Sequence, residues 1–251
     1  MRTEEVDVAV IGGGPSGMAA AVAARKAGAE RVVLIERDEQ LGGILNQCIH
    51  DGFGTKIFER ALTGPEYAQI YIDQVGETGV SYYLNTMVLD LTPERELTVC
   101  SMEGVRRIRA KSVVLCMGCR ERTRGAIGIP GHRPAGVFTA GVVQYYMNLR
   151  NLAVGRRVVV LGSGDVGLIM ARRLTLEGAQ VPCVAEILPY PSGLMRNVVQ
   201  CLEDYGIPLY LSTTAVGIHG RDRITGVTLA KIGPRGGIVP GSKRLVACDT
   251  L

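Results

Sequence analysis

Residues 8–36 read VAVIGGGPSGMAAAVAARKAGAERVVLIE, and residues 158–186 read VVVLGSGDVGLIMARRLTLEGAQVPCVAE. Each stretch has a β-branched run, a G-x-G-x-x-G motif, an Ala- and Leu-rich run that ends near a glycine, a second β-rich run and an acid. The acids, Glu36 and Glu186, each lie 24 residues after the first glycine of the motif. One glycine motif alone is weakly diagnostic because glycine is common in turns, but two complete copies predict two strand–turn–helix–strand units.

The spacing of the glycines and the acid has a physical purpose. The first glycine allows a tight turn, the second lets backbone approach a pyrophosphate, and the third lets helix pack close to strand. The helix N-terminus offers free N–H groups and a partial positive charge to phosphates. The acid accepts hydrogen bonds from ribose hydroxyls and repels a 2′-phosphate; since no arginine follows Glu186 before Arg196, the second copy favours NAD over NADP. Two sites indicate two dinucleotides, most economically a flavin and a nicotinamide.

Composition bounds the class of protein. The 251 residues are 47% hydrophobic, which suits one large or two ordinary globular domains. The net charge of +4 comes without a dense run of Lys and Arg, so we expect no nucleic-acid partner. The charged N-terminus lacks a secretory signal and no apolar stretch is long enough to cross a bilayer, so we expect a cytoplasmic protein without a transmembrane segment. Seven scattered cysteines are typical of reduced, mostly buried thiols.

The remaining segments predict further elements. Between the two copies, residues 63–79 predict a helix that Thr63 caps and Gly79 ends. Strands are expected in 80–91, 96–102 and 105–110, followed by a buried strand at 112–117. After the second copy we expect a helix at 193–206, a strand at 207–220, and further strands within 223–237 and 243–251.

This order resembles the two-dinucleotide-binding flavoproteins of the pyridine nucleotide-disulfide oxidoreductase-like family, in which a nicotinamide domain is inserted into a flavin domain. The narrower resemblance is to NAD(P)/FAD-dependent oxidoreductases associated with bacterial glycerol-3-phosphate dehydrogenase and opine oxidase systems. It is carried by LGGILNQCIHDGFG (41–54), LTGPEYA (62–68), MGCRERTRGA (117–126), RPAGVFTAG (133–141), GSGDVGLIMARR (162–173) and GIPLYLS (206–212).

The resemblance implies an α/β fold of two Rossmann-like dinucleotide-binding domains. Residues 1–120 would form the N-terminal portion of the FAD-binding domain, and residues 121–251 the NAD-binding domain with crossing segments at both ends. The family continues past the return crossing, where this sequence stops, so the resemblance implies that the C-terminal part of the flavin domain is missing from this chain.

Motifs and resemblance together give the expected cofactor contacts. Those for FAD are Gly12, Gly14, Pro15, Ser16, Gly17, Glu36, Arg37, Gly42, Gly43, Val88, Met117 and Gly118. Those for NAD(H) are Gly162, Gly164, Asp165, Val166, Gly167 and Glu186. No group of cysteines and histidines has metal-site spacing, so we expect no metal. The resemblance also implies that the chain works beside a second redox subunit or as a homodimer.

Cys116 and Cys119 form a C-x-x-C spacing within SVVLCMGCRER, residues 112–122, which is also the spacing of a redox dithiol. Disulfide-reductase members of the family carry their redox cysteines elsewhere, either after the first ribose-binding acid or just before the second glycine motif. A structural role is therefore favoured for this pair. Cys48 and His50, in a segment that the family runs beneath the flavin ring, are the remaining candidates for direct chemistry.

The function indicated is an FAD-dependent oxidoreductase that transfers hydride between NAD(H) and flavin and exchanges electrons with a partner, without a redox-active disulfide. Two alternatives stay open. One is a thioredoxin reductase-like, NAD(P)H-dependent thiol–disulfide reductase that uses Cys116 and Cys119, or Cys48. The other is a non-catalytic subunit that binds a dinucleotide.

Overall fold

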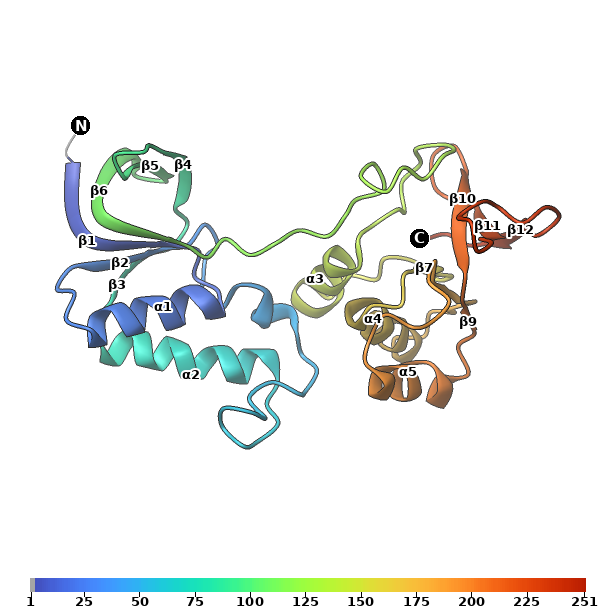
Figure 1. Ribbon diagram of the computed structural model, residues 1–251, viewed down its shortest axis with the longest axis horizontal. Coiled ribbons are helices and arrows are strands. Elements are labelled where there is room, and N and C mark those ends of the chain that lie inside the picture. The colour runs from blue at the N-terminus through green and yellow to red at the C-terminus, as the bar shows by residue number, and fades with distance from the viewer. Residues whose placement is uncertain (1–2) are drawn as a thin grey trace. The chain divides into compact units, whose positions relative to one another are not determined.

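The computed structural model describes residues 3–251, and the chain forms two compact units, Met1–Arg120 (unit 1) and Glu121–Leu251 (unit 2) (Figure 1). Each unit is α/β and contains one of the two glycine motifs between a strand and a helix.

Unit 1 is built on a six-stranded sheet of order β3-β2-β1-β6-β5-β4. Its strands are β1 (Thr3–Ile11), β2 (Val32–Ile35), β3 (Ser81–Tyr83), β4 (Met87–Leu91), β5 (Glu96–Ser101) and β6 (Gly104–Leu115). Strands β3, β2, β1 and β6 are parallel, while β4, β5 and β6 form an antiparallel meander. Helices α1 (Pro15–Lys26) and α2 (Gly64–Glu77) run beside each other along the sheet (Figure 1).

The two faces of this sheet have separate apolar cores. Val10 and Leu34 pack with Met18 of α1 on the helix-covered face. On the other face Val33 packs with Leu97 of β5 and with neighbouring residues of the meander. Because both faces are covered, β2 reads as the unbroken apolar run VVLI, as is typical of parallel strands.

The helix predicted at 63–79 is confirmed as α2, and local chemistry explains its limits. The Thr63 hydroxyl accepts a hydrogen bond from the Glu66 N–H, and the Glu66 carboxylate accepts one from the Thr63 N–H at 2.7 Å, which forms a capping box. At the other end Gly79 has a φ of +67°, a left-handed conformation that ends helices at little cost to glycine.

Strand β6 differs from the sequence prediction in two ways. It runs unbroken over Gly104–Leu115, where the sequence predicts separate strands. The predicted burial of 112–117 is wrong, because Leu115 is 58% exposed and Cys116 is half-buried. The physical reason is that β5 pairs with β6 only as far as Arg109, and no strand in residues 3–251 pairs with 111–115 on the side away from β1.

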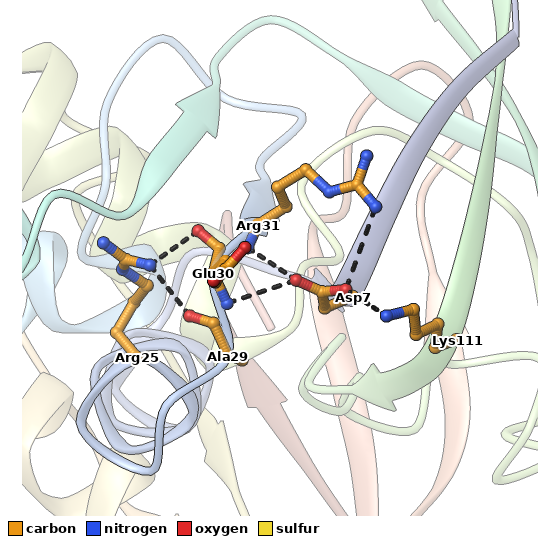
Figure 2. Close-up of polar contacts among 6 residues, drawn as sticks. All are labelled: Asp7, Arg25, Ala29, Glu30, Arg31 and Lys111. Atoms are coloured by element: carbon orange, nitrogen blue, oxygen red, sulfur yellow. Dashed lines mark hydrogen bonds and ion pairs between the residues drawn. The ribbon is translucent and has the colours of Figure 1, made fainter.

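The turn from α1 into β2 is tied to β1 by polar contacts (Figure 2). The Asp7 carboxylate accepts hydrogen bonds from the backbone N–H groups of Glu30 (3.1 Å) and Arg31 (2.8 Å) and pairs with the Lys111 ammonium at 2.8 Å. The hydrogen bond from Lys111, followed by that from the Arg31 backbone, lowers the pKa of Asp7 to about 2. Arg25 donates to the carbonyls of Ala29 and Glu30, so the helix end and the next strand are fixed together.

Unit 2 has a parallel sheet of β7 (Val160–Leu161), β8 (Val184–Ala185) and β9 (Leu209–Tyr210) and an antiparallel sheet of β10 (Thr213–His219), β11 (Gly226–Lys231) and β12 (Arg244–Ala247). Its helices are α3 (Ala140–Arg150), α4 (Asp165–Leu176) and α5 (Met195–Cys201). The helix expected at 193–206 is shorter, because the chain tightens into a 3₁₀ turn at Glu203–Tyr205. The single strand expected at 207–220 divides into β9 and β10, because Ser212 takes a left-handed φ of +47°.

No helix within residues 3–251 combines the length and apolar character that a membrane span requires.

Candidate dinucleotide-binding sites

The three glycines of the first motif meet different surroundings. Gly12 follows β1 with a φ of +105°, and a Cβ there would collide with the Cys116 carbonyl oxygen. A Cβ on Gly17, in the first turn of α1, would collide with the Gly12 carbonyl oxygen. Gly14 differs from both, because a Cβ at this position would have no heavy atom within 4 Å. Gly12 and Gly17 are therefore required by packing, whereas Gly14 faces open space at the start of a helix.

A second glycine pair borders this open space. The Gly42 N–H donates to the Gly13 carbonyl at 2.9 Å, and a Cβ on Gly43 would lie 3.0 Å from the Gly14 Cα. Both glycines have left-handed φ values, +112° and +54°. The result is a side-chain-free cradle at the N-terminus of α1, where the helix offers unpaired N–H groups, and its shape and polarity fit a pyrophosphate.

Glu36 lies at the end of β2 and is 6% exposed. Its Oε2 accepts a hydrogen bond from the Gly13 N–H at 2.6 Å, and its Oε1 accepts one from the Asp38 N–H at 2.9 Å. A carboxylate has about four acceptor positions, so one stays free on each oxygen. This arrangement fits the two hydroxyls of a ribose next to the cradle.

The other residues expected at the FAD site lie in several elements. Pro15 and Ser16 follow Gly14 in the first turn of α1. Arg37 is exposed, with its Nε 4.0 Å from Asp38 Oδ1. Met117, which is 67% exposed, and Gly118 follow β6. Val88 does not join the glycine loops: it lies in β4 and packs against the apolar core shared by the sheet and the meander, which supports a structural role.

Cys48 and His50 lie at the start of the segment between the Gly42–Gly43 cradle and α2. Cys48 is half-buried, and its carbonyl accepts a hydrogen bond from the Gly64 N–H at 2.8 Å. His50 is exposed, with Nδ1 3.0 Å from the Asp51 carbonyl and its ring 5.3 Å from that of Phe53. The segment is fixed to α2 by a run of aromatic contacts among Phe53, Phe58, Tyr67 and Tyr71. These contacts explain how the segment is held in place, but they do not identify His50 as a proton carrier.

The C-x-x-C cysteines have different environments. Cys116 packs against the core under α1, and burial raises the pKa of its thiol. Cys119 is exposed after the end of β6. Both thiols are free. A reactive thiol needs a lowered pKa, so the environment of Cys116 favours a structural role.

The second motif repeats the geometry of the first. Gly162 has a φ of +103°, a Cβ on Gly167 would lie 2.7 Å from the Gly162 carbonyl oxygen, and a Cβ on Gly164 would have no heavy atom within 4 Å. Glu186, 4% exposed at the end of β8, accepts hydrogen bonds from the backbone N–H groups of Ser163 (2.9 Å) and Leu188 (3.0 Å). These bonds match those that Glu36 accepts from Gly13 and Asp38.

The repeat extends beyond the two strands and the helix that the sequence indicated. The Glu36 N–H donates to the Tyr83 carbonyl at 2.8 Å, and the Thr86 N–H donates back to the Glu36 carbonyl at 2.9 Å. Tyr210 and Thr213 make the same two bonds with Glu186, at 2.9 and 2.7 Å. A sequence signal exists for this third strand, because residues 83–86 read YLNT and residues 210–213 read YLST.

Two serine hydroxyls distinguish the second site from the first. Ser163 Oγ and Ser192 Oγ both donate to Glu186 Oε2, at 2.5 and 2.9 Å. Burial by itself would raise the pKa of Glu186, but the hydrogen bonds from Ser163, Leu188 and Ser192 outweigh it and lower the pKa below its ordinary value. Glu186 is therefore ionised at neutral pH.

The two remaining residues expected at the NAD site lie at the start of α4. The Asp165 carboxylate accepts hydrogen bonds from the Leu194 N–H at 2.8 Å and the Asn197 side-chain amide at 2.7 Å, so it fixes the chain that follows β8. Val166 is partly exposed beside it. In the described part of the chain, no group of three or more His, Cys, Asp or Glu side chains is placed to hold a metal ion.

The pairing of a glycine loop with a buried acid at two sites agrees with the comparison to known families. The model of the pyridine nucleotide-disulphide oxidoreductase family matches residues 6–248. The chain belongs to this family. Its members are oxidoreductases that use FAD and a pyridine nucleotide. The predicted α/β fold with two Rossmann-like units is confirmed by the parallel strands in the sheet of each unit and by the match to solved structures of this fold.

Curated relatives and solved structures match most of the chain at low identity. The alpha subunit of sarcosine oxidase from Rhizobium meliloti is 25% identical over 93% of this chain and 24% of its own length. The HcnB subunit of hydrogen cyanide synthase from Pseudomonas protegens is 27% identical over 88% and 50%, and a subunit of opine oxidase from Agrobacterium tumefaciens is 27% identical over 78% and 40%. The chain thus spans from about a quarter to a half of the length of these relatives. The thioredoxin reductase of T. acidophilum has a TM-score of 0.71 at 20% identity, covering 98% of this chain and 75% of that one.

The match to an opine oxidase subunit confirms the resemblance to opine oxidase systems. The association with glycerol-3-phosphate dehydrogenase stays a prediction.

Proposed function

We propose that unit 1 binds FAD, that unit 2 binds NAD(H), and that the protein is an oxidoreductase that passes electrons between them. When both are bound, the cofactors supply the chemistry, a hydride transfer between nicotinamide and flavin ring. The chain supplies the glycine cradles that receive the pyrophosphates and the acids that receive the ribose hydroxyls.

One observation carries this proposal: two buried carboxylates have the same backbone frame. Each acid accepts an N–H from the middle residue of its own glycine loop, at 2.6 Å for Glu36 and 2.9 Å for Glu186. In each loop the second glycine of the motif faces open space. Packing alone does not require a buried carboxylate beside each glycine loop, because burying a charge is costly even when it is hydrogen-bonded.

The choice of NAD over NADP rests on charge around Glu186. The residues that follow it, Ile187 to Ser192, carry no cation, and Arg196 lies further along in α5. The pKa of Glu186 is lowered, so the site holds a negative charge where a 2′-phosphate would need a positive one. We therefore propose NAD(H) as the exchangeable dinucleotide.

A partner subunit is proposed from the relatives, which are named as subunits of sarcosine oxidase, hydrogen cyanide synthase and opine oxidase. In such an assembly this chain would exchange electrons with a second redox subunit that oxidises the carbon substrate. We extend the proposal to systems of the opine oxidase or glycerol-3-phosphate dehydrogenase kind, from the sequence resemblance. A homodimer is the alternative assembly.

A thiol–disulfide reductase is the second candidate, because the fold also matches thioredoxin reductases and the chain has a C-x-x-C pair. The raised pKa of the Cys116 thiol opposes it, since the thiolate is the reactive form. The double variant Cys116→Ser/Cys119→Ser separates the two. It should keep NADH-dependent flavin reduction under the main proposal and lose reduction of a disulfide reagent under the second.

The test is the visible spectrum of the purified full chain, reconstituted with FAD, before and after anaerobic addition of NADH. Bleaching of the flavin bands by NADH is the expected result, with Glu186→Gln as the variant that should need more NADH. A chain that takes up FAD but never bleaches would leave a non-catalytic, dinucleotide-binding role as the better account. A chain that binds neither dinucleotide would overturn the proposal.

A further inference from the structure

Glu36 and Glu186 share a backbone frame but differ in what else contacts the carboxylate. Glu36 accepts two hydrogen bonds, one on each oxygen, both from backbone N–H groups. Glu186 accepts the equivalent two and, in addition, the hydroxyls of Ser163 and Ser192, both on Oε2. The difference lies entirely in side chains, because the surrounding backbone bonds are the same in both copies.

The sequence positions of these serines are occupied differently in the first copy. Ser163 corresponds to Gly13, because each is the middle residue of its glycine loop. Ser192 corresponds to Leu41, because the residue after each of them, Gly193 or Gly42, donates its N–H to the carbonyl of that middle residue. A Cβ on Gly13 would lie 2.6 Å from Leu41 Cδ2, so the leucine fills the space that a serine side chain takes in the second copy. A glycine–leucine pair in one copy is thus replaced by two hydroxyls in the other.

The two hydroxyls are committed to the acid. Ser163 Oγ donates to Glu186 Oε2 at 2.5 Å and accepts from the Ser192 N–H at 3.0 Å, while Ser192 Oγ donates to the same Oε2 at 2.9 Å. With the Ser163 N–H, Oε2 receives three donors, one more than its two acceptor positions, so none is left for a ligand. Oε1 receives only the Leu188 N–H at 3.0 Å and keeps one acceptor position.

We propose that Ser163 and Ser192 are positioning residues that occupy Glu186 Oε2, so that unit 2 receives its dinucleotide through a single ribose hydroxyl on Oε1. Unit 1, where Glu36 keeps a free acceptor position on each oxygen, receives both hydroxyls. The inference rests on the proposed function of unit 2 as the NAD(H) site. Its consequence is that the second site gives up a hydrogen bond of the charge-assisted kind, which suits a dinucleotide that leaves after each turnover.

The unmodified full chain provides the first test. Isothermal titration calorimetry, with FAD present to occupy unit 1, would compare NADH with its 2′-deoxyadenosine and 3′-deoxyadenosine analogues. One analogue should bind as NADH does, and the other about tenfold more weakly, since a hydrogen bond to a charged group is lost only once. Two analogues that are weakened equally would overturn the inference.

A variant gives the second test. Ser163→Gly with Ser192→Ala removes both hydroxyl donors and frees Oε2, so NADH should bind about tenfold more tightly and both deoxy analogues should now be weakened. Ser192→Thr with native Ser163 keeps both hydroxyl donors, so this variant should remain sensitive to only one analogue, as the unmodified chain is. Thermal unfolding of each variant identifies a folding defect, and the analogue series on the unmodified chain stays decisive if one occurs. Unchanged or weakened NADH binding in a folded double variant would contradict the inference.

The outcomes separate the inference from the proposed function. Absence of NADH binding to the unmodified chain would overturn the proposed function itself. NADH binding that Glu186→Gln weakens, together with equal sensitivity to both analogues, would leave the proposed function in place and overturn only the role of the two serines.

Discussion

Substitution by alanine should have opposite effects on the free energy of unfolding at Gly14 and at Gly17, although the two positions lie in one turn. Gly14 has φ −73° and ψ −176°, which any residue adopts, and its Cβ would meet no heavy atom within 4 Å. Gly14→Ala should therefore keep the free energy of unfolding or raise it by up to about 1 kcal/mol, because alanine restricts the unfolded chain. The new methyl group would occupy the space offered to the pyrophosphate. At an overpacking cost of about 1–3 kcal/mol, FAD should bind roughly 5- to 150-fold more weakly.

Gly17→Ala should instead destabilise unit 1. Its Cβ would overlap the Gly12 carbonyl oxygen, and the backbone there is held by a hydrogen bond of 2.8 Å from the Gly12 N–H to the Ile35 carbonyl. A clash with fixed backbone belongs at the upper end of overpacking costs, about 3 kcal/mol. The better helix propensity of alanine returns about 1 kcal/mol, so the expected net loss is about 2 kcal/mol.

Urea unfolding without FAD, followed by circular dichroism, measures the free energy of unfolding. A titration with FAD, followed by flavin fluorescence, measures the FAD affinity. Gly76→Ala is the matched control, since Gly76 also lies within a helix and a Cβ there would meet nothing within 4 Å. It should raise stability by about 1 kcal/mol and leave FAD affinity unchanged. Normal FAD affinity in Gly14→Ala would contradict the expected steric conflict with the pyrophosphate. A Gly17→Ala variant as stable as Gly76→Ala would contradict the expected clash with the Gly12 carbonyl oxygen.

Three further predictions concern charge and capping. Ile187→Arg places a cation next to Glu186 and should shift the ratio of NADPH to NADH affinity towards NADPH by about tenfold, as measured by calorimetry. Asp7→Asn removes the charged partner of Lys111 and should lower the free energy of unfolding at neutral pH. The pKa of Asp7 in the folded chain is lowered to about 2, so this loss of stability should be complete above pH 4 and should disappear as the pH falls towards 2. Thr63→Ala removes the N-cap of α2 and should cost about 1 kcal/mol in urea unfolding.

Each of these has a contrary outcome. An unchanged NADPH to NADH ratio in Ile187→Arg would place the ribose acid of the exchangeable dinucleotide elsewhere. A stability difference for Asp7→Asn that persists at pH 2 would show that the ion pair is not its source. Equal stability of Thr63→Ala would mean that tertiary packing alone sets the start of α2.

Prediction from the sequence was most accurate where a structure depends on neighbours in the chain. The turns at Gly12 and Gly162, the helices that follow them and the capped start of α2 were all predictable, because turn conformation and capping act over a few residues. The predicted burial at the end of β6 was wrong, because burial depends on which strand pairs alongside. The contact that the resemblance suggested for Val88 stays a prediction, and the packing of Val88 in the meander argues against it.

By itself, the sequence determined that the chain has two glycine-loop units of the same kind, each with an acid at the end of its second strand. Only the tertiary structure decided which side chains complete them. Ser192, at the end of the loop that follows β8, donates its hydroxyl to Glu186. Tyr83 and Tyr210 occupy equivalent positions in β3 and β9, although the segments that precede these strands differ in length. Unequal loops break the spacing on which pattern reading depends, whereas hydrogen bonds between parallel strands restore the same geometry in space.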